Sequence, residues 1–434
     1  MRTILSVLAF FSLWGPLRAQ TGTPSCAREL PRSPLIVGAT CQEAARAADG
    51  NRYVVRPGAW TRDGNVLSVP FTVPFAWINR QVFVRIPHAS SDYAVRVNGR
   101  MVGSAFDNST AAEFNVTKFV NEGRNTLELV LSEPSGSAPL ESWRPEQAAP
   151  AAGEAIVLSQ PTMHVRDIAV KTWRADGEDE TATAEIALIV KSDALNPRTS
   201  RIHYELLAPD GSTAASGYDD MTLDMRREDT LRFVVRIPDT LQWSAERPVL
   251  HTLRVRTQHD GRYVEYIEEP VGFRSVEMRG ERMFVNGQPA ALNVREVRPD
   301  ITDEEIAALR GKGVNTLLPL PGTIGEPLYE ACDRSGMYVI VQAPVDTRRS
   351  GPSRRKEGNP ANDPSWQEAF AERTADAYHV AKRHPSVIAF SLARQSSNGI
   401  CLYESYLRMK ETGDPRPFVY PEAAGEWNSD PLAY

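Results

Sequence analysis

The sequence predicts a multidomain protein in which β-sheet domains come first and an α/β domain follows. Short runs of alternating apolar and polar residues recur between residues 66 and 271, and this period of two is typical of antiparallel sheet. From residue 302 onward, helical patterns alternate with short apolar runs, as in a parallel sheet. With 434 residues, 41% of them hydrophobic, the chain is long enough for two or three packed domains.

The first antiparallel region is predicted from five runs and one turn. The runs cover residues 66–73, 81–86, 93–97, 125–131 and 154–158. Asn98-Gly99 follows the third run and is a strong hairpin signal. A segment rich in Ser, Pro and Ala, residues 134–153, separates the last two runs and reads as a loop.

A second antiparallel region follows. Its strands are predicted at residues 164–170, 184–190, 202–207 and 231–235. The acidic run 176–180 is interpreted as a solvated hairpin tip.

The α/β region is predicted to alternate helices and strands. Helices are expected at residues 303–312, 326–335 and 366–383, the first capped by Thr302, and strands at 316–320, 337–341 and from 387.

The first twenty residues indicate a secretory signal, because Arg2 precedes an apolar run at residues 4–14. No segment is apolar for long enough to span a membrane. In an oxidising compartment we expect Cys26 and Cys41 to form a disulfide, and we expect Cys332 and Cys401 to be buried free thiols. The net charge of −6 favours no nucleic-acid partner, and no Cys or His spacing indicates a metal site.

Residues 383–399, RHPSVIAFSLARQSSNG, resemble a catalytic strand of glycoside hydrolase family 2, the family of β-galactosidases and β-glucuronidases. Members of that family read roughly RHPSV, an apolar strand, then SLGNESxNG, where the Glu is the general acid/base. The matching position here is Gln395, and the preceding Asn is replaced by Arg394. An amide cannot exchange a proton at any useful pH, so the resemblance implies the family without its acid/base.

The resemblance extends over nearly all of the chain after residue 66. VNGRMVG and the runs after it resemble the family's sugar-binding jelly roll, WSAERPVLHTL resembles its immunoglobulin-like domain, and VGFR leads into its barrel. It implies a jelly-roll β-sandwich, an immunoglobulin-like β-sandwich and an incomplete TIM-type (β/α) barrel. The expected divisions are a signal at 1–20, an amino-terminal segment at 21–50, the jelly roll at 51–160, the immunoglobulin-like domain at 161–272 and the barrel at 273–434.

Other strand ends of the expected barrel also depart from the family. Where the first strand of the family carries two His, this chain has Arg295 and Arg298, and Gln342 replaces an acidic residue of the third strand. The family nucleophile belongs to the seventh strand, whereas residues 428–434 resemble the sixth-strand segment. About six strands are therefore expected here, against about eight in a closed barrel.

Three carboxylates are candidates for a rewired catalytic site, Glu422 or Glu426 together with Glu296. Ordinary surface or salt-bridging roles are the simpler interpretation of all three. The basic loop at residues 348–356 is interpreted as solvated, with an anionic partner as a second reading. Trp60, Trp77 and Trp143 could stack on sugar rings, although core packing is more common for such residues.

The sequence therefore predicts an exported relative of the family, in the periplasm or on the outer cell surface, that has lost hydrolysis. We expect it to bind carbohydrate or to act as an assembly component of an envelope complex. The expected partner is an envelope protein or a second copy, contacting the open side of the barrel. The alternative is a divergent glycosidase with a rewired or partner-completed site. No cofactor is implied.

Overall fold

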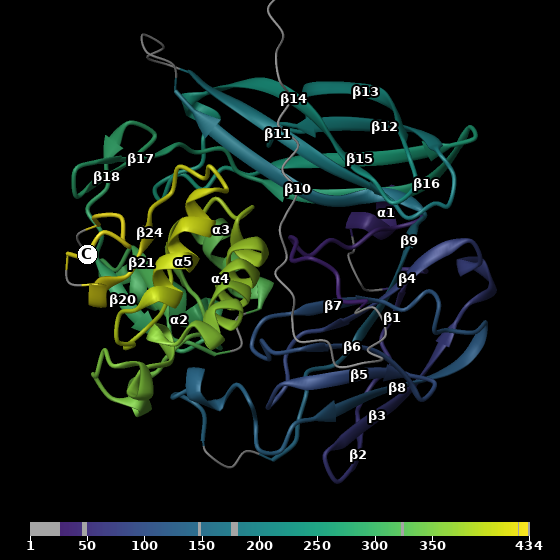
Figure 1. Ribbon diagram of the computed structural model, residues 1–434. Helices are drawn as coiled ribbons and strands as arrows, with labels where there is room; N and C mark the ends of the chain where they lie inside the picture. Colours follow the sequence, from purple (N-terminus) through teal and green to yellow (C-terminus); the bar gives the residue numbers. More distant parts are fainter. Residues whose placement is uncertain are drawn as a thin grey trace, which may run out of the picture.

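The computed structural model describes residues 27–45, 50–145, 149–174, 181–322, 325–423 and 425–432. The expected secretory signal, Cys26 and the acidic run 176–180 lie outside these residues. Among the described residues, no helix is both long enough and apolar enough to cross a membrane. Two β-sandwiches and an α/β domain make up the molecule, so the predicted fold class is confirmed (Figure 1).

The first sandwich consists of two antiparallel sheets, in the orders β1-β9-β4-β7 and β2-β3-β8-β5-β6. One sheet is built from β1 (Val54–Val55), β9 (Ile156–Pro161), β4 (Arg80–Ile86) and β7 (Ala112–Asn115). The other is built from β2 (Thr61–Asp63), β3 (Val66–Val73), β8 (Gly123–Leu131), β5 (Tyr93–Val97) and β6 (Arg100–Ala105). Alternate residues of β3 are buried, as its period of two predicts. Asn98 and Gly99 both have positive φ, 52° and 73°, in the turn between β5 and β6.

The second sandwich pairs a sheet of order β10-β11-β14 with one of order β13-β12-β15-β16. Its strands are β10 (Met163–Trp173), β11 (Thr181–Ser192), β14 (Glu228–Pro238), β13 (Thr213–Leu223), β12 (Arg198–Leu207), β15 (His251–His259) and β16 (Arg262–Val271). Tyr204 of β12 stacks on Phe233 of β14 with ring centroids 3.8 Å apart, so the two sheets share one core. β13 has no apolar alternation that would predict it, because most of its residues are exposed.

The amino-terminal segment runs between the two sandwiches before the short helix α1 (Cys41–Ala45) (Figure 1). Leu35 and Val37 join the core of the second sandwich, and Gly38 pairs with Tyr266 of β16. The Arg32 guanidinium donates to a Glu113 carboxylate oxygen of the first sandwich at 2.7 Å. This segment therefore holds the two sandwiches together.

The α/β domain has a parallel sheet in sequence order, β20-β21-β22-β23-β24, with five strands in the described residues. The strands are β20 (Val294–Val297), β21 (Thr316–Pro319), β22 (Tyr338–Gln342), β23 (Val387–Ser391) and β24 (Phe418–Val419). The helices are α2 (Asp303–Gly311), α3 (Glu326–Ser335), α4 (Gln367–Ala381) and α5 (Ile400–Lys410). A small antiparallel sheet of β17 (Val276–Arg279), β18 (Arg282–Val285) and β19 (Gln288–Pro289) precedes them. The predicted cap is confirmed, because Thr302 Oγ1 accepts from the Glu305 backbone N–H and Glu305 accepts from that of Thr302.

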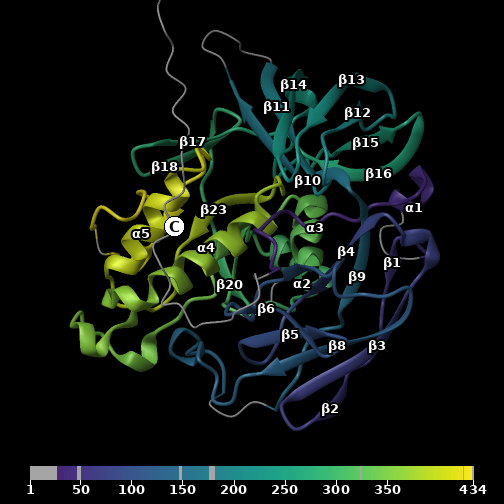
Figure 2. The ribbon, with the colours of Figure 1, turned by 45° about the vertical axis from the view of Figure 1, so that its right-hand side comes forward.

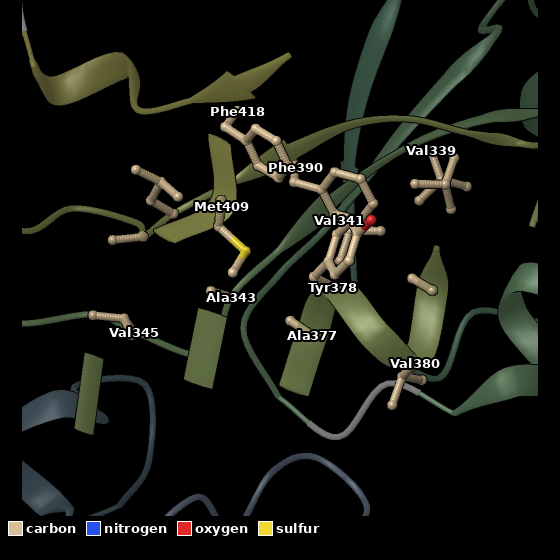
Figure 3. Close-up of a cluster of buried hydrophobic side chains, with 14 of the residues drawn as sticks. Val339, Val341, Ala343, Val345, Ala377, Tyr378, Val380, Phe390, Met409 and Phe418 are labelled. Carbon is tan, nitrogen blue, oxygen red and sulfur yellow. The ribbon is translucent and has the colours of Figure 1, made fainter. Parts of the chain in front are cut away.

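The core of the α/β domain lies between the parallel strands and their helices (Figure 3). Phe390 of β23 stacks on Phe418 of β24 at 5.5 Å between centroids, and Tyr378 of α4 contacts both rings. These aromatic contacts hold β24 in the sheet although it has only two residues.

Residues 425–432 contain no strand, and the end of the segment that resembles the sixth strand, residues 433–434, lies outside the described residues. Asp430 exchanges backbone and side-chain hydrogen bonds with Phe418: its N–H donates to the Phe418 carbonyl, and its carboxylate accepts from the Phe418 N–H, each at 2.9 Å. Ser429 Oγ accepts from the Tyr420 N–H at 2.8 Å. The segment therefore caps the outer edge of β24 with side chains instead of continuing as a strand.

Candidate functional site

The loops that follow the parallel strands meet at the carboxyl end of the sheet, where this fold class places its sites (Figure 2). Isolated parallel bridges join Glu141 to Asp346 and Asp346 to Arg394. The loop at 134–145 of the first sandwich thereby lies against the loops after β22 and β23. The site is consequently built from two domains.

Gln395 lies in the loop after β23 and is exposed. Its φ of 45° is in the left-handed region, which costs a non-glycine residue of order 1 kcal/mol and is enriched at functional sites. The backbone N–H of Gln395 donates to a carboxylate oxygen of Glu422 at 2.9 Å. The position of the expected acid/base is therefore held in a defined geometry, but its side chain is an amide.

Arg394 and Glu296 form a bidentate ion pair across the site. The two guanidinium nitrogens lie 2.5 and 3.2 Å from the two carboxylate oxygens. The Arg394 side chain is only 14% exposed, so it is held in place, whereas Glu296 is 53% exposed. Because both oxygens of Glu296 accept from the guanidinium, part of the hydrogen-bonding capacity of this carboxylate is taken up by Arg394.

Glu426 belongs to a neighbouring group. One of its oxygens pairs with Arg354, and the other accepts from Asn398 Nδ2 at 2.9 Å. The structure thus brings all five residues singled out from the sequence to one end of the sheet. It separates them into the Arg394–Glu296 pair, the Gln395–Glu422 contact and the Glu426 group.

The predicted basic loop contains two short 3-10 helices at Arg348–Ser350 and Lys356–Gly358. Arg348 lies 2.8 Å from a carboxylate oxygen of Asp346, a residue with no exposed surface. Burial raises the pKa of Asp346, and hydrogen bonding and charge from Arg348 oppose that shift. This part of the loop is accordingly an ordered element that faces the site.

Two supporting residues were missed at the level of sequence. Ser396 Oγ accepts from the Thr347 N–H at 3.1 Å, and its carbonyl accepts from the hydroxyl of Tyr420, which is 1% exposed. Burial raises the pKa of Tyr420, so the hydroxyl stays a donor. Ser396 belongs to the motif at residues 383–399 but was not singled out in it, Tyr420 belongs to no motif, and only their meeting in space reveals the role.

The remaining sequence candidates lie elsewhere. Trp77 is in the core of the first sandwich, and the half-buried Trp60 donates from its ring nitrogen to the Gly153 carbonyl at 2.9 Å. Cys332 and Cys401 are buried free thiols, as predicted. Cys41 is exposed, but its expected partner Cys26 lies outside the described residues, so the disulfide remains a prediction.

Chemically, the site offers hydrogen-bonding groups around the carboxylates of Glu296, Glu422 and Glu426. Arg, Asn and Gln side chains occupy the positions around the carboxylates, a set suited to binding hydroxyl groups. In the described part of the chain, no group of three or more His, Cys, Asp or Glu residues could hold a metal ion.

Two family models match the chain. One, described as glycosyl hydrolases family 2, matches residues 163–274, and the other, the TIM barrel domain of that family, matches residues 304–431. Among curated relatives, the β-galactosidase of Priestia megaterium is 26% identical over 374 residues and that of Aeromonas hydrophila is 29% identical over 373. Each alignment covers 81% of this chain but 35% of the relative, so the chain spans about a third of those proteins.

Solved structures of low identity share the fold. Bacteroides uniformis β-glucuronidase 2 superposes with a TM-score of 0.67 at 17% identity, covering 91% of this chain and 52% of that one. A β-glycosidase from Bacteroides vulgatus gives a TM-score of 0.66 at 18% identity, covering 86% and 49%.

Proposed function

We propose that this chain, which belongs to glycosyl hydrolase family 2, binds carbohydrate without hydrolysing it. The observation that carries the proposal is the pairing at the ends of β20 and β23. Gln395 stands at the expected acid/base position, and the guanidinium of Arg394 occupies both oxygens of Glu296. A retaining glycosidase needs two carboxyl groups about 5 to 5.5 Å apart, one of them free to give and take a proton.

Loss of the general acid alone removes on the order of 10² to 10⁴ in rate. We expect aryl β-galactosides, β-glucuronides and β-mannosides to turn over no faster than in buffer. The variant Gln395→Glu should remain inactive, because it restores only one of the two carboxyl groups that a retaining glycosidase needs. Isothermal titration with soluble β-linked tetrasaccharides of glucose, galactose, mannose and xylose should instead show binding of at least one, with a Kd below about 1 mM. Absence of binding to all four would refute the proposal.

One observation favours a divergent hydrolase as the second candidate. A carboxylate oxygen of Glu422 lies 2.9 Å from the backbone nitrogen of Gln395, next to the position expected for the acid/base. If Glu422 had taken over that role, the protein would hydrolyse an aryl glycoside and Glu422→Gln would abolish the turnover. Glu426→Gln is the matched test of the other candidate carboxylate, which pairs with Arg354 and Asn398. Turnover lost in either variant would establish the enzyme and overturn the binding-only proposal.

Export and participation in an envelope complex are further parts of the proposal, supported by the sequence of residues 1–20. Cell fractionation should place the protein in the periplasm or on the outer surface. Ser429 and Asp430 cap the outer edge of β24, so we propose that an envelope protein or a second copy contacts the α/β domain on the β20 side. Affinity capture from envelope extract and light scattering test this. A strict monomer without a stoichiometric partner would remove the assembly role and leave carbohydrate binding intact.

A further inference from the structure

A surface cavity of about 360 Å³ lies at the rim of the α/β domain, between the loops that follow β22, β23 and β24. This volume is within the range of small-molecule sites. The residues that matter in its lining are Arg354, Asn398, Tyr403, Glu426, Trp427 and Asn428. Gln395 and Glu296 are not part of it.

Trp427 provides an apolar surface in this cavity. It is 61% exposed, which is unusual because Trp side chains are highly buried on average. Its ring lies against Tyr403 of α5. An exposed aromatic ring can receive the apolar face of a flat ligand.

The polar groups beside Trp427 are held in place. Asn398 and Asn428 exchange reciprocal amide hydrogen bonds of 3.0 and 2.7 Å, and both are more than nine-tenths buried. Asn398 also donates to Glu426, whose other oxygen pairs with Arg354. Both partners of this pair remain partly exposed, with spare acceptor sites on the carboxylate and spare N–H groups on the guanidinium. Preorganised groups of this kind bind a ligand without first losing conformational entropy.

Two other cavities have less suitable linings. One of about 460 Å³ lies at the amino ends of β21 and β22, and its only aromatic residue, Tyr338, is almost fully buried. Another of about 470 Å³, beside the loop at 134–145, is lined mainly by Ser, Pro and charged residues and by no aromatic ring. Neither combines an exposed ring with fixed planar polar groups.

We infer that the rim cavity is the carbohydrate site of this protein and that its ligand is a neutral glycan. A pyranose ring would lie on the face of Trp427, while its hydroxyl groups bond to Glu426 and Arg354. One carboxylate and one guanidinium offset each other, so the cavity favours a neutral sugar over a uronic acid. This inference rests on the proposed carbohydrate binding and specifies where it takes place and which sugars it accepts.

The test is isothermal titration of the full chain with the four neutral tetrasaccharides and with tetragalacturonate. Trp427→Ala should weaken binding of the best neutral tetrasaccharide at least about 30-fold, the effect of removing a central Trp from a binding surface. Trp427→Phe should recover part of the loss, and Glu426→Gln should weaken binding while keeping the shape of the site. Tyr218→Ala is the matched control, because Tyr218 is similarly exposed, at 58%, and lies on the second sandwich. Thermal unfolding of each variant verifies that it is folded.

The outcomes separate the two proposals. If wild-type protein binds none of the tetrasaccharides, the proposed function and the inferred site both fail. If the wild type binds but Trp427→Ala binds equally tightly, only the location is refuted. If tetragalacturonate binds more tightly than every neutral tetrasaccharide, the neutral class of ligand is wrong.

Discussion

Arg373 of α4 offers a direct test of how the α/β domain is attached to the first sandwich. Its side chain has no exposed surface. The guanidinium donates to the Pro344 carbonyl at 2.7 Å, to the Phe106 carbonyl at 3.1 Å and to a Glu141 carboxylate oxygen at 2.6 Å. A single cation thus bonds the loop after β22 and two segments of the first sandwich.

Replacing this residue in the variant Arg373→Met keeps the approximate length of the side chain and removes all three hydrogen bonds. Two buried carbonyl groups lose their donor, and the Glu141 carboxylate, 1% exposed, loses one of its two cations. Removing one partner of a buried ion pair costs about 3 to 5 kcal/mol. We therefore expect a loss of that size in the free energy of unfolding.

Urea unfolding, followed both by tryptophan fluorescence and by proteolysis of the loop at 134–145, measures the effect. The two probes are needed because a multidomain chain need not unfold in one step. Arg408→Met is the control, because its ion pair with Glu368 is exposed and is worth at most about 1 kcal/mol. Adding Glu141→Gln to Arg373→Met should restore part of the loss, because one of the two buried carboxylates near the guanidinium, Glu141 and Asp107, is then neutral. An Arg373→Met variant within about 1 kcal/mol of the control would refute the reasoning.

Three further predictions concern stability. Gly336 has a φ of 70°, and a Cβ added there would meet a backbone carbonyl, so Gly336→Ala should lower the free energy of unfolding in urea by more than about 1 kcal/mol. Gly313→Ala is the control, because φ is 83° there but the space around it is open. Equal losses in the two variants would contradict the prediction. Burial lowers the pKa of His251 to about 4, so the unfolded chain binds a proton at this imidazole more tightly than the folded chain does, and stability should fall as the pH drops from about 6.5 to about 4. His251→Phe should lose less stability over that window. An unchanged dependence of stability on pH in this variant would be inconsistent with the mechanism. Non-reducing peptide mapping of exported protein should recover a peptide in which Cys26 is linked to Cys41. A disulfide that closes a loop of this length stabilises the fold by about 3 kcal/mol. Two free thiols would overturn the pairing.

Local interactions made much of the fold predictable. The helix at Asp303–Gly311 begins after its cap Thr302, and this start is predictable because the capping hydrogen bonds join residues only three apart. Buried and less buried residues alternate along β3 because adjacent side chains of a strand point to opposite faces. The site was predictable only as a set of positions. Glu296 and Arg394 are separated by 98 residues, so no local pattern could show that the second neutralises the first.

By itself, the sequence determined that position 395 carries an amide, which cannot ionise, and the resemblance of residues 383–399 predicts that this is the acid/base position of the family. It also determined the order of the domains, since the change in hydrophobic period is a property of neighbouring residues. Only the tertiary structure decided which charges meet and where a ring is left exposed. The loops after β22, β23 and β24 come together through the pairing of their strands, and that pairing places Trp427 beside Tyr403 and Glu426 between Arg354 and Asn398. Contacts of this kind depend on chain closure over tens of residues, which periodicity and composition do not encode.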